Sequence, residues 1–281
     1  MLVERIKLKN FRNYRETEVV FDKGVHVFSG FNAQGKTNLL EAIFLAVLGK
    51  SFRAGHDDEL IRWGEEFSIV ESSFSNHVAD YSLVFKLQRG AVRENILNGQ
   101  QVKKKEIIGL LNAVFFSPED LWLIKGSPSG RRRYIDFSIA QSDSVYYQNL
   151  LRYNRVLLQR NQLLKKINAG FSKKNLLDLW DEQLSFLAEK ISLKRVERVK
   201  ELSNASNMIH SRITNGAEDF SAHYLIYCGS DMTENNYSEW FKNKLIVARE
   251  KDIARGTTDV GPHKDDMCFT LHSYDGKIFA S

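Results

Sequence analysis

The chain has 281 residues, of which 43% are hydrophobic and 27% are charged, and this composition is typical of a globular protein. No apolar run approaches the roughly 18 residues of a membrane span, and the N-terminus lacks the apolar core of a signal peptide, so we expect a cytoplasmic protein without membrane contact. The formal net charge of +5 and the isoelectric point of about 9.0 favour a polyanionic partner only weakly.

The N-terminal third of the chain predicts short strands and one helix. Alternating or short apolar segments indicate strands at residues 2–8, 18–21, 25–29, 67–70 and 81–87. Asn98 and Gly99 separate two further extended segments, and this residue pair is typical of a two-residue hairpin turn. Residues 113–116 are a candidate for a buried strand that ends before Pro118.

Residues 25–45 combine an apolar strand, a loop of the form G-x-x-x-x-G-K-T and an apolar helix. Glycines let such a loop point several backbone N–H groups inward, and the helix N-terminus adds its partial positive charge, which together suit a triphosphate. A glycine-containing turn that binds nothing is the alternative, and the flanking strand and helix disfavour it. The predicted nucleotide-binding residues of this segment are Gly30, Phe31, Asn32, Ala33, Gln34, Gly35, Lys36, Thr37 and Asn38.

Two of these residues have specific expected roles. We expect Lys36 to reach the β- and γ-phosphates, because a lysine at this place in the loop points at the end of the triphosphate chain. We expect the Thr37 hydroxyl to bind the accompanying Mg²⁺. The sequence therefore predicts a protein that uses ATP and Mg²⁺.

From Gly126 onward the leucines recur at helical spacing. Two long helices with a break at residues 168–170 predict a helical hairpin, followed by a strand at 224–227 and a helix at 238–255. A second hairpin turn is predicted at 274–276, between strands at 267–271 and 277–279. We therefore divide the chain into an ATP-binding α/β domain over 1–125, a helical arm over 126–255, and a return to the first domain over 256–281.

The basic excess of the chain is concentrated in the helical segment. From Arg131 to Lys200, fifteen Lys and Arg residues outnumber seven Asp and Glu residues, which leaves eight excess positive charges. A merely solvated helix surface is the alternative, since lysine and arginine are good helix formers. Segregated positive charge favours sequence-independent binding to a phosphate backbone. The candidate DNA-binding residues are Arg131, Arg132, Arg133, Arg152, Arg155 and Lys166.

These candidates fall into two groups. Arg152, Arg155 and Lys166 lie at roughly helical spacing and are expected to share one face of a helix. The three consecutive arginines at 131–133 stand at the entry to the helical segment, where they are expected either to bind DNA or to couple the ATP state to the position of the arm.

Six motifs, in order along the whole chain, resemble the RecF family of bacterial DNA replication and repair ATPases, which is related to the SMC and ABC ATPases. The first three are NFRNY at 10–14, GFNAQGKTN at 30–38 and KSFR at 50–53. The others are FSPEDL at 116–121, KGSPSGRRR at 125–133 and GPHKDD at 261–266. The resemblance implies an α/β fold, an ABC/SMC-type P-loop ATPase domain with a helical insertion domain.

The resemblance also implies several residue roles. Arg12 and Asn13 lie where the SMC-like relatives contact the nucleotide. Residues 117–120 resemble the Q-loop region, so Glu119 or Asp120 is a candidate metal ligand beside Thr37. Arg53 and His263 lie in motifs of the family, but the residues alone indicate no role for them.

A signature motif and a Walker B strand ending in acidic residues are missing from the pattern. The resemblance implies that Ser281 is the first residue of the signature motif, so we expect an N-terminal part of a longer protein with an incomplete ATPase domain. Because phosphoryl transfer depends on charge neutralisation around the metal and the attacking water, we expect this chain to bind nucleotide weakly and to hydrolyse little.

By resemblance, the expected function is that of an ATP-switched dimeric DNA clamp in recombinational gap repair, replication-fork maintenance and the SOS response. The implied partners are single-stranded, double-stranded and gapped DNA, the mediators RecR and RecO, and a second copy of the full-length protein. A P-loop kinase acting on a small molecule is an alternative that the long basic helical segment disfavours. A DNA-binding scaffold without hydrolysis is the other alternative.

Overall fold

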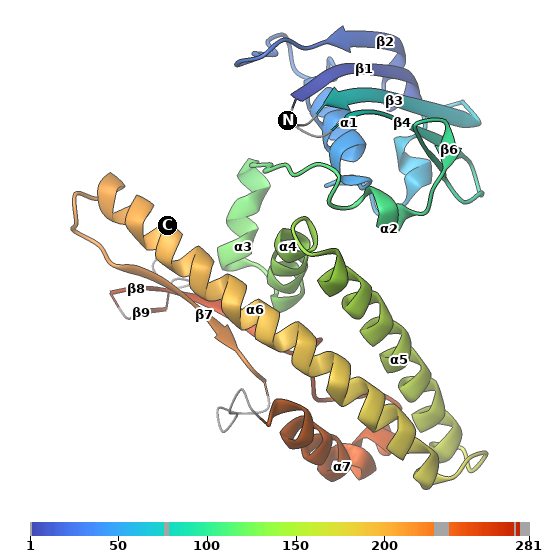
Figure 1. The fold of residues 1–281 in the computed structure, drawn as a ribbon, viewed down its shortest axis with the longest axis vertical. Helices are drawn as coiled ribbons and strands as arrows, with labels where there is room; N and C mark the ends of the chain where they lie inside the picture. Colours follow the sequence, from blue (N-terminus) through green and yellow to red (C-terminus); the bar gives the residue numbers. More distant parts are fainter. Residues whose placement is uncertain (1, 76–78, 228–235, 273, 276–281) are drawn as a thin grey trace. The chain divides into compact units, whose positions relative to one another are not determined.

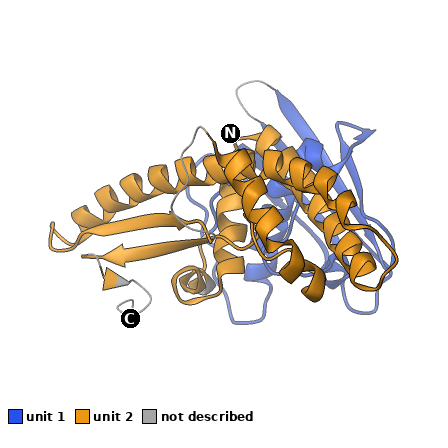
Figure 2. Ribbon diagram, turned by 90° about the horizontal axis from the view of Figure 1, so that it is seen from below, with its two compact units in different colours: residues 1–115 blue, residues 116–281 orange. Residues whose placement is uncertain are grey.

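A computed structural model describes residues 2–75, 79–227, 236–272 and 274–275, without the side chains of Glu119 and Asp275. The chain divides into two compact units, unit 1 (Met1–Phe115) and unit 2 (Phe116–Ser281), which Figure 2 distinguishes by colour. None of the helices within the described ranges combines the length and the apolar character that crossing a membrane requires.

Unit 1 is an antiparallel sheet covered by one main helix. The strands follow the order β2-β1-β3-β4-β5-β6, and helix α1 packs against β1, β3 and β4 (Figure 1). Alternating apolar residues of β1 and β4, such as Ile6, Leu8 and Phe85, are buried, as are Ala42 and Leu45 of α1. The elements of this unit are β1 (Leu2–Phe11), β2 (Tyr14–Val20), α1 (Lys36–Leu48), η1 (Asp57–Leu60), β3 (Phe67–Ser75), β4 (Asp80–Gln88), β5 (Glu94–Leu97), β6 (Gln100–Gln101) and α2 (Lys104–Ile107).

The predicted hairpin at Asn98 and Gly99 is confirmed. Leu97 pairs with Gln100, and the two turn residues have φ angles of 49° and 80°. A two-residue turn between right-twisted strands requires positive φ at both central positions, and asparagine and glycine tolerate it best.

Two strand predictions in unit 1 are wrong. Residues 25–29 are extended but form no strand, and Val25 and Val27 are 93% and 83% exposed. Residues 113–116 also form no strand; Phe115 stacks on Phe52 with ring centroids 4.0 Å apart. The apolar pattern at both places is real, but a strand needs a neighbour for its backbone groups, and no described strand pairs with either segment.

Unit 2 packs a set of helices with a small antiparallel sheet of order β7-β8-β9 (Figure 1). Helix α6 contacts α5, α7 and β7, so it is the central element of this unit. The elements are η2 (Pro118–Leu121), α3 (Trp122–Lys125), α4 (Pro128–Ala140), α5 (Ser144–Asn168), η3 (Lys174–Leu176), α6 (Leu177–Ile213), β7 (Phe220–Leu225), α7 (Tyr237–Arg255), β8 (Asp266–Leu271) and β9 (Tyr274–Asp275).

The predicted helical hairpin is confirmed. Helix α5 begins after Asp143, whose carboxylate accepts a hydrogen bond of 2.8 Å from the Tyr146 N–H. It ends at the predicted break, where Gly170 takes a φ of 79°. Helix α7 follows close to its predicted range, and Gly256 ends it in the left-handed conformation.

The C-terminal part of the chain differs from expectation. Residues 256–275, expected to return to the ATP-binding domain, lie in unit 2, where β8 pairs with β7. The second hairpin was predicted at 274–276, but Tyr274 and Asp275 already pair with β8 as strand residues. Tight turns are placed by the register of the strands, which a single Asp-Gly pair does not determine. The second strand predicted for this hairpin, 277–279, lies outside the described residues.

Candidate nucleotide site

The backbone of the loop between residues 30 and 35 takes positive φ angles at three positions. Gly30, Ala33 and Gly35 have φ angles of 144°, 64° and 104°, so the chain turns repeatedly through the left-handed region. Helix α1 then starts at Lys36, and Gly35 at its N-cap supplies no side-chain hydrogen bond. No side chain at the N-cap therefore satisfies the first N–H groups of the helix, and such an N-terminus suits an anion.

Two backbone carbonyls of this loop bind the Lys36 side chain. Its Nζ donates to the carbonyl oxygens of Gly30 at 2.6 Å and of Phe31 at 2.7 Å. The ammonium group therefore lies at the backbone of residues 30 and 31, and its contact with a triphosphate stays a prediction.

The turn between β1 and β2 closes one side of the loop. A Cβ at Gly35 would lie 2.7 Å from the Asn13 side chain, and the Tyr14 hydroxyl donates to the Gly35 carbonyl at 3.2 Å. Asn38 of α1 donates to Asn13 Oδ1 at 2.8 Å. The structure therefore brings Asn13 and Asn38 together at the loop, while their contact with a nucleotide stays a prediction. Only glycine fits at position 35.

A buried carboxylate on α1 holds two arginines beside the loop. Glu41 has no exposed surface and accepts two hydrogen bonds from Arg12, at 2.9 and 2.7 Å, and one from Arg53 at 2.9 Å. Ser51 donates a fourth at 2.6 Å. Arg53 also donates to Asn38 at 2.7 Å, so the network connects to the first turn of the helix.

The charge balance of this network explains the ionisation of Glu41. Burial alone would raise the pKa of the Glu41 carboxyl, but the hydrogen bonds from Arg12 and Ser51 and the charges of Arg12 and Arg53 outweigh it. The pKa therefore lies below its usual value, and Glu41 stays ionised. Two guanidinium groups share one carboxylate, which leaves one positive charge next to the phosphate loop.

Sequence reasoning missed Glu41 and the placement of Arg53. The available signal was a single carboxylate in the otherwise apolar stretch of residues 39–45, because a charge on the buried face of a helix needs a partner. The identity of that partner was not readable, since Arg12 and Arg53 lie 29 and 12 residues away along the chain.

The residues present fit a bound Mg²⁺ only in part. Thr37 is exposed on the first turn of α1, where its hydroxyl is accessible as one oxygen ligand. No group of three or more His, Cys, Asp or Glu side chains among the described residues forms a metal site. Mg²⁺ usually takes few protein ligands and completes its shell with phosphate oxygens and water, which is compatible with this arrangement.

The other two metal candidates belong to unit 2. The Asp120 carboxylate accepts two hydrogen bonds from Ser117, one from its backbone N–H at 2.5 Å and one from the Ser117 hydroxyl at 3.1 Å. Asp120 is therefore engaged at the start of the short helix η2. The side chain of Glu119 lies outside the described residues. A metal-binding role for either residue stays a prediction.

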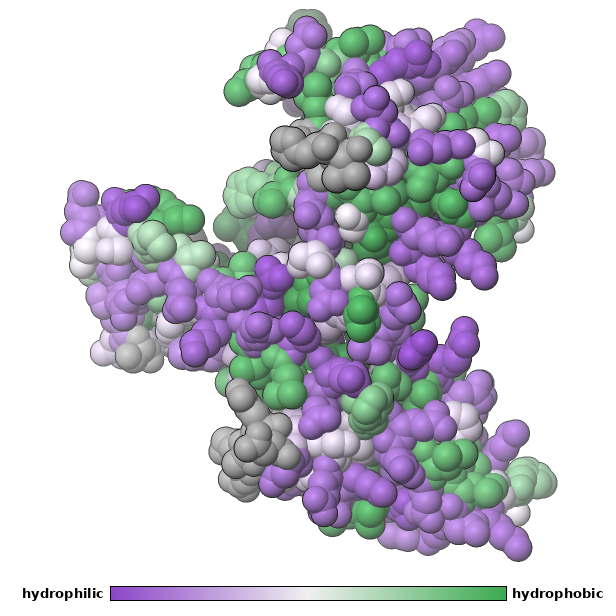
Figure 3. Space-filling view, in the orientation of Figure 1, coloured by the Kyte–Doolittle hydropathy of each residue, from purple (hydrophilic) through white to green (hydrophobic). Residues whose placement is uncertain are grey.

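The candidate DNA-binding residues have different environments. Arg152, Arg155 and Lys166 are all exposed on α5, and Figure 3 shows a largely hydrophilic visible surface over the helices of unit 2. Arg133 is exposed as well, and Arg132 is half-buried and donates to the Asp265 carbonyl at 2.7 Å. These positions are compatible with the prediction but do not test it.

Arg131 requires a correction. Its side chain has no exposed surface, and its guanidinium donates to both carboxylate oxygens of Asp266, at 2.7 and 2.8 Å. A third hydrogen bond of 2.7 Å goes to the Gly126 carbonyl. Arg131 therefore connects α4 to β8 inside unit 2 and is not available for direct contact with DNA. Three adjacent arginines on a helix point in different directions, so one of them faces the core.

The chain is similar to known proteins over its whole length. A family model described as an AAA domain matches residues 5–219. The DNA replication and repair protein RecF of Lachnospira eligens is 38% identical over 100% of this chain and 76% of the relative. The protein of the same name from Clostridium acetobutylicum is 36% identical, with the same shares of both chains.

The chain is also similar to solved RecF structures over nearly its whole length. The recombination mediator protein RecF with ATP, from the RecFOR pathway, superimposes with a TM-score of 0.94 at 35% identity, covering 99% of this chain and 75% of that chain. The structure of the recombination mediator protein RecF-ATPrS superimposes with a TM-score of 0.92 at 34% identity, covering 100% of this chain and 76% of that chain. The predicted α/β fold class is confirmed, since the chain shares the fold of these RecF structures.

Proposed function

The chain belongs to the RecF family of DNA replication and repair proteins, and from this premise we propose that it binds ATP with Mg²⁺ at the loop of residues 30–38 and that bound ATP changes its affinity for DNA. The proposed setting is the cytoplasm, in recombinational gap repair, replication-fork maintenance and the SOS response. The proposed partners are single-stranded, double-stranded and gapped DNA, RecR and RecO, and a second copy of the full-length protein.

The observation that carries the nucleotide part is the geometry around Lys36. An ammonium group, a series of left-handed backbone positions and an uncapped helix N-terminus converge on one loop. Together they supply the positive charge and the N–H donors that a triphosphate needs. Thr37 supplies one oxygen to the metal, and Arg12 and Asn13 lie at the side of the loop, where they are proposed to contact the nucleotide.

The DNA part of the proposal is supported by the exposed cationic residues of unit 2. Backbone phosphates are bound by lysine and arginine regardless of base sequence, so this contact is expected to weaken steeply with salt. Closure of two subunits on DNA when ATP is bound, and release after hydrolysis, is the proposed cycle. When bound, Mg²⁺ would neutralise phosphate charge during that hydrolysis.

The first test is the variant Lys36→Ala. Without the ammonium group, about tenfold or more of the affinity for ATP is expected to be lost, because a charge-assisted contact to phosphate contributes about 1.5–3 kcal/mol. Titration with a fluorescent ATP analogue measures this, with circular dichroism to establish folding. Lys86→Ala, which removes an exposed lysine of β4, is the matched control. A folded Lys36→Ala variant that binds ATP like the control would refute the assignment.

A further inference from the structure

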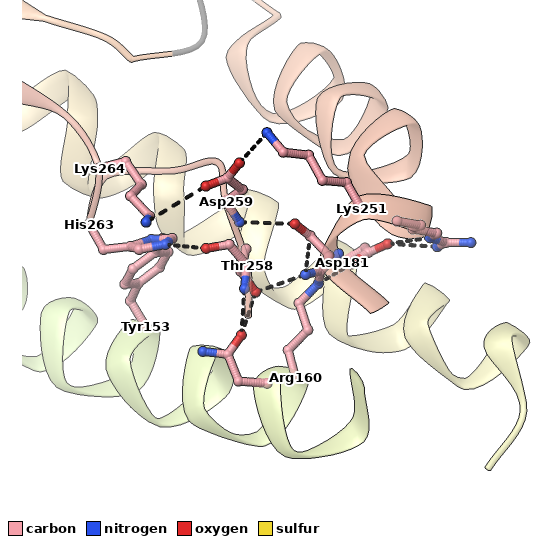
Figure 4. Close-up of polar contacts among 11 residues, drawn as sticks. Tyr153, Arg160, Asp181, Lys251, Thr258, Asp259, His263 and Lys264 are labelled. Carbon is pink, nitrogen blue, oxygen red and sulfur yellow. Dashed lines mark hydrogen bonds and ion pairs between the residues drawn. The ribbon is translucent and has the colours of Figure 1, made fainter. Parts of the chain in front are cut away.

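A half-buried carboxylate in unit 2, that of Asp259, is surrounded by three cationic side chains. Lys251 and Arg255, one turn apart on α7, lie 2.5 and 3.1 Å from Asp259 Oδ2, and Lys264 lies 3.7 Å from Oδ1. Figure 4 shows Lys251 and Lys264 reaching Asp259 from two different segments. We call Lys251, Arg255, Asp259 and Lys264 the Asp259 cluster.

A network of buried hydrogen bonds holds the backbone next to the Asp259 cluster. The Asp259 N–H donates to Asp252 at 3.0 Å, and Arg160, which is fully buried, donates to Asp252 at 2.7 Å and to the Thr258 hydroxyl at 2.8 Å. The Thr258 N–H and hydroxyl both donate to Asn161, at 2.8 and 2.7 Å. Figure 4 shows this network directly beneath Asp259. Backbone held by buried hydrogen bonds keeps its exposed side chains in a defined place.

The turn that carries Lys264 is also held by hydrogen bonds. His263 lies between the Tyr153 hydroxyl, at 2.7 Å from Nδ1, and the Thr258 carbonyl, at 3.0 Å from Nε2. The Lys264 N–H donates to the Gly261 carbonyl at 2.7 Å. Lys264 therefore projects from a fixed turn and not from a loose loop.

The charge of the cluster is not balanced. Three cations meet one carboxylate, and the cationic side chains of Lys251, Arg255 and Lys264 stay 56%, 57% and 40% exposed while that of Asp259 is 16% exposed. The surface thus presents more positive charge than its own acid neutralises.

We propose that the Asp259 cluster is a binding site for the phosphate backbone of a nucleic acid, in which a phosphate competes with Asp259 for Lys251, Arg255 and Lys264. The proposal rests on the proposed DNA binding and gives it a location in addition to the α5 face of Arg152, Arg155 and Lys166. The convergence of three cations on the Asp259 oxygens shows that these side chains can share a single oxyanion.

Physical considerations favour this exchange. All three cations are exposed, and ion pairs in contact with water contribute only about 0–1 kcal/mol each, so little is lost when the cations leave Asp259 for a phosphate. The guanidinium of Arg255 can bind two phosphate oxygens at once. Asp259 then acts as a built-in competitor that weakens binding.

The first experiment compares two variants of the whole chain that lose the same charge. In one variant, Lys251, Arg255 and Lys264 are replaced by glutamine; in the other, the replaced residues are Arg152, Arg155 and Lys166. Fluorescence anisotropy with a labelled mixed-sequence duplex gives the affinity over a range of salt concentrations. For the cluster variant, we expect the slope of log affinity against log salt to fall by about one per lost contact.

The second experiment replaces the competitor by Asp259→Asn. The amide has the same shape but no charge, so DNA affinity is expected to rise about fivefold at low salt, with a steeper salt dependence. A residue with only a structural role would not give tighter binding when it is replaced. Thermal unfolding of all variants shows whether each is folded at the assay temperature.

The outcomes separate the two proposals. If the wild-type chain does not bind the duplex at all, the proposed DNA binding fails. If the wild type binds, but the cluster variant matches it and Asp259→Asn gives no gain, the site lies elsewhere and this inference is overturned. Competition by polyglutamate as effective as competition by unlabelled DNA would assign the cluster to an acidic protein segment and would also overturn it.

Discussion

Glu41 shows at the scale of one residue how the nucleotide site depends on a group outside the phosphate loop. Its carboxylate is fully buried and holds Arg12 and Arg53, which otherwise would repel each other beside the loop. A buried charge is costly unless it is paired, and here four hydrogen bonds compensate it. We therefore regard Glu41 as a positioning residue for the two arginines.

Replacement of Glu41 by alanine is expected to cost about 3–5 kcal/mol of unfolding free energy, because it leaves the Arg12 guanidinium partly buried without its partner. Nucleotide affinity is expected to fall as well, since Arg12 and Arg53 lose the carboxylate that positions them beside the loop. Urea unfolding and nucleotide titration measure the two effects. Glu18→Gln, which breaks the half-exposed pair with Arg5, is the control and should cost about 1 kcal/mol or less. Equal costs for both variants would contradict the role of Glu41.

At the scale of elements, buried arginines hold unit 2 together. Arg160 on α5 pairs with Asp181 of α6 and Asp252 of α7, and Arg195 on α6 pairs with Asp136 of α4. Each of these arginines connects helices that are distant in sequence, so the helical arm is held by specific polar contacts in addition to its apolar core. Arg195 also donates to the Pro262 carbonyl at 2.6 Å, which places the turn that carries His263.

His263 makes the stability of this unit depend on pH. Burial, opposed by the hydrogen bond with the Thr258 carbonyl and reinforced by the charges of Lys264, Arg132 and Arg195, lowers the pKa of His263 from 6.5 to about 4. Since the unfolded chain binds the proton more strongly, the stabilisation is complete above about pH 6.5 and is lost as the pH falls toward 4. The full effect corresponds to about 3 kcal/mol.

The measurement is urea unfolding of the wild type and of His263→Gln between pH 4 and 7. The raised pKa of Asp265, caused by its burial, has the opposite sign, so the informative quantity is the difference between the two proteins at each pH. We expect the wild type to lose stability relative to the variant on acidification. Parallel profiles for the two proteins would mean that His263 is not kept neutral by the fold.

For the whole molecule, local patterns in the sequence predicted the elements more reliably than their partners. The helix that follows the glycine loop, the Asn98–Gly99 turn and the break near Gly170 depend on neighbouring residues, and all three are present. The expected strands at 25–29 and 113–116 depend on pairing with another strand, which their own residues do not specify. Arg131 and Glu41 were misread or missed for the same reason, because their partners lie far along the chain.

The last prediction concerns the two units acting together, since the nucleotide loop lies in unit 1 and the cationic surface in unit 2. If ATP binding changes DNA affinity by some factor, thermodynamic linkage requires DNA to change ATP affinity by the same factor. We expect ATP to tighten DNA binding, by about 5- to 150-fold if the coupling has the usual size. Anisotropy titrations of DNA with and without ATP, and of a fluorescent ATP analogue with and without DNA, measure both sides.

The variant Lys36→Ala is the control for this linkage. It should retain the DNA affinity of the ATP-free wild type, because its cationic surface in unit 2 is unchanged, but ATP should no longer alter that affinity. Two equal factors in the wild type and none in the variant would establish that the loop at residues 30–38 is the source of the coupling. DNA affinity that is identical with and without saturating ATP would rule out ATP switching in this chain, even if both ligands bind.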